Sequence, residues 1–102
     1  MLTVFQKQVH KALSEIPRGM VTTYSLLSNH LKTKAVRAVA TAVGKNPDYP
    51  RVPCHRVVLS DGQIGKYSGT GGVKRKIKLL QQEGVEVESD RIVDFENKLY
   101  SF

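Results

Sequence analysis

Cys54 is the only cysteine of the chain. A thiol becomes a useful nucleophile only as its thiolate, so it needs a nearby base or positive charge. His55 and Arg56 follow it directly in the sequence and could supply either. A free cysteine is also among the most buried residue types and usually acts as a small hydrophobic side chain. The pair Cys54–His55 on its own therefore leaves a reactive thiol and a structural thiol both open.

Four other polar residues could support such chemistry, and each also has an ordinary structural interpretation. Asn46 precedes a proline and suits a turn. Arg37 suits a solvated helix position, and Tyr24 suits a partly buried aromatic site. Glu83 could be a surface carboxylate at the end of a helix. Taken singly, these residues do not decide the function.

The loop that leads into Cys54, residues 46–53, contains three prolines. Each proline fixes its own backbone angle and restricts the residue before it. Such a stiff loop is suited to holding a reactive side chain in one place.

Helical patterns surround this loop. Thr3 is a predicted cap for an apolar-periodic helix within 4–16, and Thr23 caps a second helix over 24–31. A third helix is predicted from 34 to about 43. Two short helices joined by a few residues are typical of a helix-turn-helix.

Downstream, residues 57–64 carry a hairpin signal with a Ser-Asp-Gly turn, which would be the wing of a helix-turn-helix protein. A last helix is predicted over 73–83, ended by Gly84, and the tail 85–102 forms a small hairpin or an irregular strand. The fold class is therefore mainly α with a small β-hairpin wing, a winged-helix-like helix-turn-helix domain. We expect one domain over 1–102, with 85–102 as a C-terminal extension.

The net charge of +7 is unevenly distributed. Residues 1–84 hold 14 Lys and Arg against 4 Asp and Glu, whereas residues 85–102 hold 2 against 5. A polyanion such as DNA is the natural partner of a basic body, because neutralised phosphates release counterions. A basic surface without any nucleic-acid role remains the alternative.

A single cysteine excludes an intrachain disulfide and a zinc cluster built on several thiols. The N-terminus lacks the apolar core of a signal peptide, and no stretch approaches the ~20 apolar residues of a membrane helix. We expect a cytoplasmic (or nuclear) monomer that needs no metal, cofactor or membrane.

Three sequence strings together resemble one family. PRVPCHRVV, with RAVATAVGKNP before it and GKYSG after it, is similar to the C-terminal domain of the 6-O-alkylguanine-DNA alkyltransferases, or methylated-DNA–protein-cysteine methyltransferases. The likeness extends from about Phe5 to Gly84. It implies DNA repair by a single-use transfer of an alkyl group from the 6-oxygen of guanine to the protein. The N-terminal domain of such relatives, with any zinc site it carries, is expected to be absent here.

The resemblance implies roles for the catalytic residues. Cys54 matches the alkyl acceptor, and His55 matches the base that deprotonates it through a water molecule. Glu83 matches the carboxylate that orients the histidine. Asn46 matches the residue whose side chain joins the helix-turn-helix to the active-site loop.

The resemblance also implies how alkylated duplex DNA would be bound. Arg37 matches an arginine that fills the gap left by a flipped nucleotide, and Tyr24 a residue that helps to rotate that nucleotide. Flipping is needed because an atom paired inside a duplex cannot reach a pocket. The predicted groups at the minor groove are Ala35, Ala38, Ala40 and Thr41, and those at the pocket are Tyr67, Ser68 and the backbone carbonyls near Cys54 and Val57.

Two alternatives belong to other functional classes. Short alkyltransferase-like proteins share this fold, replace the acceptor cysteine and sense lesions without transfer. The retained Cys54, His55 and Glu83 favour transfer, whereas the short chain favours the sensor. A winged-helix regulator, which would prefer one promoter sequence, is the third possibility.

Overall fold

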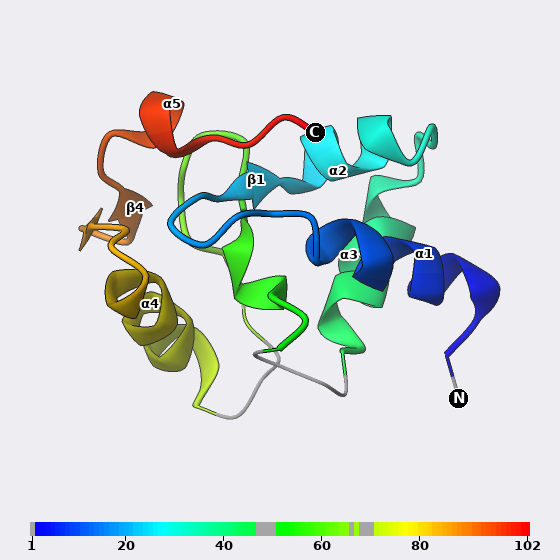
Figure 1. Cartoon of the computed structure of the whole chain (residues 1–102), viewed down its shortest axis with the longest axis horizontal. Helices are drawn as coiled ribbons and strands as arrows, with labels where there is room; N and C mark the ends of the chain where they lie inside the picture. Colours follow the sequence, from blue (N-terminus) through cyan, green and yellow to red (C-terminus); the bar gives the residue numbers. More distant parts are fainter. Residues whose placement is uncertain (1, 47–50, 66, 68–70) are drawn as a thin grey trace.

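The computed structural model describes residues 2–46, 51–65, 67 and 71–102. Helices α1 (Val4–Leu13), α2 (Tyr24–His30) and α3 (Val36–Gly44) form one side of the molecule. Helix α4 (Gly72–Gln82), strands β3 (Val87–Glu88) and β4 (Arg91–Ile92) and the short α5 (Phe95–Lys98) form the other side (Figure 1). Between them lie β1 (Thr22–Thr23), β2 (Val57–Val58) and the 3₁₀ turn η1 (Cys54–Arg56).

The predicted helix caps are present. The Thr3 hydroxyl accepts from Gln6 N, while Gln6 Oε1 accepts from Thr3 N, which makes a complete capping box. The Thr23 hydroxyl accepts from Leu26 N at the start of α2. Helix α1 ends at Leu13, three residues before the last residue of its predicted apolar face, and Ile16 is buried in the turn that follows.

The helix-turn-helix is formed by α2 and α3. Helix α2 ends at His30 with Leu31 as its C-cap, and the next residue, Lys32, has a positive φ of 58°. This turn lies at the break that the sequence predicted at Lys32 and Thr33. Helix α3 begins at Val36, two residues later than predicted, because Val36 N donates to Lys34 O and Thr33 Oγ1 takes the N–H of Ala35. Fold class and helix order agree with the sequence prediction.

The hairpin predicted at 57–64 needs a correction in its pairing. Its turn is present, since Leu59 N donates to Gln63 O and Gly62 has a φ of +88°. However, β2 pairs in parallel with β1, and the antiparallel contacts are made by Gln63 with Arg91 and by β3 with β4. The reason is burial: Val57 and Val58 are fully buried, so this strand lies inside the molecule and not on a solvent-exposed wing.

Two hydrophobic clusters fill the interior, and β2 contributes to both. Val57 belongs to the cluster of α1, α2 and α3, and Val58 belongs to the cluster of α4 and the C-terminal hairpin. The C-terminal segment returns to the side formed by α1, α2 and α3. There Tyr100 N donates to Val21 O, and Phe102 stacks on His30 with ring centroids 4.4 Å apart. The tail hairpin left open by the sequence is confirmed as β3–β4.

Candidate active site

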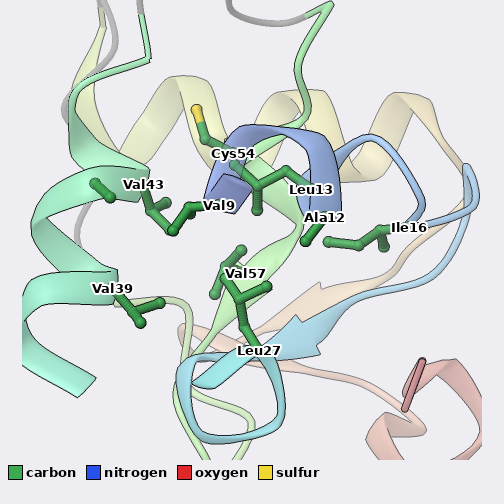
Figure 2. Packing of buried hydrophobic residues seen from close by; sticks show 10 residues of the cluster. Val9, Ala12, Leu13, Ile16, Leu27, Val39, Val43, Cys54 and Val57 are labelled. Atoms are coloured by element: carbon green, nitrogen blue, oxygen red, sulfur yellow. The ribbon is translucent and has the colours of Figure 1, made fainter. Parts of the chain in front are cut away.

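Cys54 begins η1 and belongs to the hydrophobic cluster formed with α1, α2 and α3. Its thiol is free and its residue is only 4% exposed. In Figure 2 its sulfur points away from the aliphatic side chains of Val9, Leu13 and Val57. The turn itself is held by backbone hydrogen bonds, because Cys54 N donates to Val52 O and Arg56 N donates to Pro53 O.

The cavity beside Cys54 has a volume of about 510 Å³. Its walls come from α2, α3 and the segments after β2, and most of its lining is apolar or small. Cys54 therefore lies where a ligand in the cavity would meet its sulfur. The lining residues are Tyr24, Ala40, Thr41, Val43, Gly44, Cys54, Leu59, Gly65 and Tyr67.

His55 follows Cys54 in η1, is buried at 1% exposure, and bonds to Glu83. Its Nε2 lies 3.0 Å from Glu83 Oε2. A carboxylate can only accept a hydrogen bond, so the neutral imidazole carries its proton on Nε2 and keeps the Nδ1 lone pair. Within the described structure, His55 Nδ1 has no hydrogen-bond partner. That nitrogen is the one left to accept a proton.

Burial controls the protonation of this pair. It lowers the pKa of His55, and Glu83 only partly offsets the effect, so the imidazole is neutral near pH 7. Burial alone would raise the pKa of Glu83, but the hydrogen bonds from Arg56 and His55 outweigh it and hold that pKa below its usual value. The site thus combines a neutral base with an ionised orienting carboxylate.

Glu83 owes its position to the end of α4. It is the C-cap residue, and Gly84 follows with a φ of +86°. Gly84 N donates to Gln81 O and Val85 N donates to Leu80 O, which are the two bonds of a Schellman motif. The predicted end of this helix at Gly84 is therefore also what places the carboxylate.

Among the described residues, Arg56 makes three hydrogen bonds, and none of them goes to the thiol. Its Nε donates to Glu83 Oε1 at 2.9 Å and its Nη2 to Glu83 Oε2 at 2.7 Å. Its Nη1 donates to the carbonyl of Ile16 at 2.7 Å. The sequence allowed Arg56 to act on Cys54 directly, whereas these contacts place its charge on Glu83.

Asn46 contacts the segment that leads into Cys54. It follows α3 closely, and its Nδ2 donates to Val52 O at 2.6 Å, two residues before Cys54. Residues 47–50, the centre of the predicted proline loop, lie outside the described residues. The role of Asn46 in joining the helix-turn-helix to the active-site loop remains a prediction.

Of the predicted pocket residues, Tyr67 lines the cavity and Ser68 lies outside the described residues; Tyr24, predicted to help rotate the nucleotide, also lines the cavity. Burial, followed by the nearby charge of Cys54, raises the pKa of Tyr24, so its hydroxyl stays protonated and can donate. Val57 is fully buried and is not among the lining residues described for the cavity, and its carbonyl accepts from Lys76 Nζ at 2.8 Å. A carbonyl oxygen has two lone pairs, so this bond leaves room for a second donor.

Lys76 is the site residue that the sequence analysis missed. It is fully buried in α4 and donates to the carbonyls of Val57 and Ile64. Burial lowers its pKa to about 8, and the negative charge of a Cys54 thiolate opposes this shift. The signal was present in the helical spacing, since Lys76 shares the inward face of α4 with Leu79 and Leu80.

Apart from Tyr24, which begins α2, the predicted DNA-binding residues lie on the outer face of α3 or at its N-cap. Arg37 is exposed there, and Val39, Ala42 and Val43 point inward. The segment from 32 to 45 contains four Lys and Arg and no acidic residue. Its small exposed residues would allow a close approach by a partner: Ala35, Ala38, Ala40 and Thr41.

The described residues were also predicted to need no metal and no membrane. In that part of the chain, no group of His, Cys, Asp and Glu is arranged to hold a metal ion. None of its helices is both long and apolar enough to cross a membrane.

The fold and the site define a winged-helix-like helix-turn-helix domain with a buried cysteine centre. Residues 4–85 match the family described as "6-O-methylguanine DNA methyltransferase, DNA binding domain", and the chain belongs to this family. It is 43% identical over 86 residues to the methylated-DNA–protein-cysteine methyltransferase of Methanothermobacter thermautotrophicus, covering 84% of this chain and 47% of that protein. It is 46% identical over 87 residues to the bifunctional transcriptional activator/DNA repair enzyme Ada of Escherichia coli, covering 84% and 24%. The chain thus spans about half or less of these relatives.

Solved structures agree with this assignment. The Mycobacterium tuberculosis OGT in complex with DNA superposes with a TM-score of 0.76 at 40% identity, covering 81% of this chain and 51% of that one. The S. pombe Atl1 in complex with damaged DNA containing O6-carboxymethylguanine gives a TM-score of 0.80 at 29% identity. That second match covers 98% of both chains, so it includes the C-terminal segment that lies beyond residue 85.

Proposed function

We propose that this protein repairs DNA by moving an alkyl group from the 6-oxygen of guanine to Cys54. The observation that carries the proposal is the cysteine beside a cavity, followed by a neutral histidine whose Nε2 is held by Glu83. This is the nucleophile, base and orienting group of covalent catalysis. Family membership supports the substrate, double-stranded DNA with an alkylated guanine.

The proposed reaction is one displacement. Cys54 Sγ attacks the alkyl carbon, the S–C bond forms as the C–O bond breaks, and the electron pair leaves with the guanine oxygen. The thiol proton passes through a water molecule to His55 Nδ1. The guanine anion takes a proton from the Tyr24 hydroxyl; solvent restores that proton, and His55 releases the one that it accepted to solvent. No step regenerates the thiol, so each molecule reacts once.

The exposed face of α3 supplies the proposed DNA contacts. Arg37 would fill the gap left by a flipped nucleotide, and its basic neighbours would meet phosphates. The small residues allow the helix to approach the minor groove. Ala40 and Thr41 belong both to this face and to the cavity wall, so a nucleotide leaving the duplex there would enter the cavity directly. Minor-groove binding carries little sequence information, which suits a protein that finds lesions anywhere.

The intact mass of the protein after mixing with duplex DNA containing 6-O-methylguanine tests this proposal. We expect one methyl group in place of the thiol hydrogen, mapped to Cys54 and saturating at one per protein. The Cys54→Ala variant should gain no mass and still bind the modified duplex. Methylation of that variant, or of another residue in the wild type, would contradict the proposed acceptor.

A lesion sensor without transfer activity is the second candidate. The observation that favours it is the end-to-end match to S. pombe Atl1 bound to damaged DNA. The same experiment separates the two functions. Tight, lesion-selective binding with an unchanged mass would make this protein a sensor with an unreactive cysteine.

A further inference from the structure

The contacts of Arg56 have a consequence for the base that the proposed reaction uses. Glu83 Oε2 is shared, because it accepts from His55 Nε2 at 3.0 Å and from Arg56 Nη2 at 2.7 Å. Its other oxygen accepts from Arg56 Nε at 2.9 Å. Arg56 therefore grips both oxygens of the carboxylate in a bidentate fork, a geometry that lysine cannot reproduce.

The side chains of His55, Glu83 and Arg56 are largely shielded from solvent. His55 is 1% exposed, and the Arg56 and Glu83 side chains are 13% and 7% exposed. In such surroundings a carboxylate without a second partner would strongly favour the imidazolium form of its histidine. A protonated His55 could not accept a proton from Cys54. The positive charge of Arg56 opposes that outcome, since it balances the charge of Glu83.

We propose that Arg56 is a positioning residue of the alkyl transfer, which holds Glu83 in the orientation that meets His55 Nε2 and keeps His55 in its neutral form. The role rests on the proposed function, but its electrostatic part belongs to the free protein. Arg56 acts through Glu83 and does not touch the reacting atoms. Its third bond, to the Ile16 carbonyl, anchors the guanidinium from the opposite side.

The groups that face His55 from every neighbouring element agree with this assignment. Helix α4 contributes Glu83 and Lys76, and the turn η1 contributes Cys54 and Arg56. Both Arg56 and Lys76 act to lower the pKa of His55, after the larger effect of burial. Helix α1 also packs against the turn; its buried titratable residue, His10, bonds through Nε2 to the Ala42 carbonyl.

The test compares two substitutions of Arg56 with one of Arg18. Arg56→Gln removes the charge, and Arg56→Lys keeps the charge but loses the fork. Arg18→Gln is the matched control, because Arg18 Nη2 donates to the Gln82 carbonyl, next to Glu83, without touching the carboxylate. Thermal unfolding of all three variants measures how much each change alters the fold.

The first measurement is the NMR titration of the His55 ring in the DNA-free protein, which needs no transfer activity. We expect Arg56→Gln to raise the His55 midpoint by about one pH unit, as loss of a neighbouring cation does. Arg56→Lys should leave the midpoint near the wild-type value but weaken the preference for the Nε2-protonated tautomer. A midpoint in Arg56→Gln equal to that in Arg18→Gln would overturn the proposal, even if Arg56→Gln unfolds more easily. If Arg56→Gln does not fold, an unchanged tautomer in Arg56→Lys would overturn it.

The second measurement is the pH profile of Cys54 methylation. The acidic limb should move to higher pH in Arg56→Gln, following the NMR midpoint, and stay in place in Arg56→Lys. The plateau rate of Arg56→Lys should fall by about tenfold or more because the base is misoriented. An acidic limb that does not move in Arg56→Gln would contradict the role of Arg56. A wild-type protein that never gains mass would instead contradict the proposed function, and the NMR result would still decide the role of Arg56.

Discussion

The charged residues of this protein occupy two regions that follow opposite rules. On the outer face of α3, Arg37 and the neighbouring lysines are exposed and make no ion pair in the described part of the chain. At the end of α4, Glu83, His55 and Arg56 are buried and bonded to one another. Solvated charges are free to meet a polyanion, whereas charges that control a proton must be fixed and shielded. The two regions should therefore respond differently to substitution.

Removing a buried charge should have the largest effect on stability. Glu83→Ala leaves Arg56 and His55 without their shared acceptor in a site that excludes most water. Loss of one partner of a buried ion pair destabilises a protein by about 3–5 kcal/mol. Chemical denaturation should show a loss of this order, together with loss of Cys54 methylation. A change below about 1 kcal/mol would mean that the cluster is far more hydrated than its burial indicates.

Acid should lower the free energy of unfolding by a smaller amount than Glu83→Ala does, through the two buried titratable groups. The pKa of His55 is lowered in the folded protein, so the unfolded chain takes up a proton at about pH 6.5 while the folded protein does not. The pKa of Glu83 is lowered too, and the unfolded chain takes up that proton at about pH 4.3. The free energy of unfolding should therefore fall as pH drops from about 7 towards 4.

A His55→Gln variant isolates the histidine part of this acid effect. It should lose the portion of the slope that lies just below about pH 6.5, while Arg37→Ala should keep the full slope. The measurement is the free energy of unfolding of the three proteins at a series of pH values. Equal slopes in His55→Gln and the wild type would show that His55 is not shielded in the folded state.

An exposed charge on α3 should matter least for stability and most for DNA. Arg37→Ala should change the free energy of unfolding by less than about 0.5 kcal/mol. It should slow methylation on duplex DNA by about tenfold or more, a loss of about 1.4 kcal/mol, and hardly affect reaction with the free modified base. Lys7→Ala, which removes an exposed charge from α1, is the matched control. Equal losses on duplex and free base would remove the proposed role of Arg37.

Local signals made much of the fold predictable. The caps Thr3 and Thr23 and the helix end at Gly84 are determined by residues within a few positions along the chain. The order of the helices follows from their apolar periodicity, and this places Asn46 and Cys54 at either end of the predicted proline loop. The resemblance added the pairing of His55 with Glu83, which the structure places 3.0 Å apart.

Long-range contacts were not predictable in the same way. The parallel partner of β2 is separated from it by 35 positions, from Thr22 to Val57, and two-residue strands leave no periodicity to detect. The fork of Arg56 on Glu83 depends on how η1 and α4 meet in space. The burial of Lys76 was not predicted, because Lys74, Arg75 and Lys78 around it give this segment the composition of a solvated surface.

The parallel pair β1–β2 acts as a mechanical link. Tyr24 follows β1 directly, and Cys54 begins the turn that leads into β2. The segments that carry Tyr24 and Cys54 are thus connected by the parallel pairing of β1 with β2, in which Thr22 lies opposite Val57 and Thr23 opposite Val58. In the proposed DNA complex, a displacement of α2 would be transmitted through this short ladder to the segment that carries the thiol. Helix α2 and the sulfur of Cys54 would then shift together.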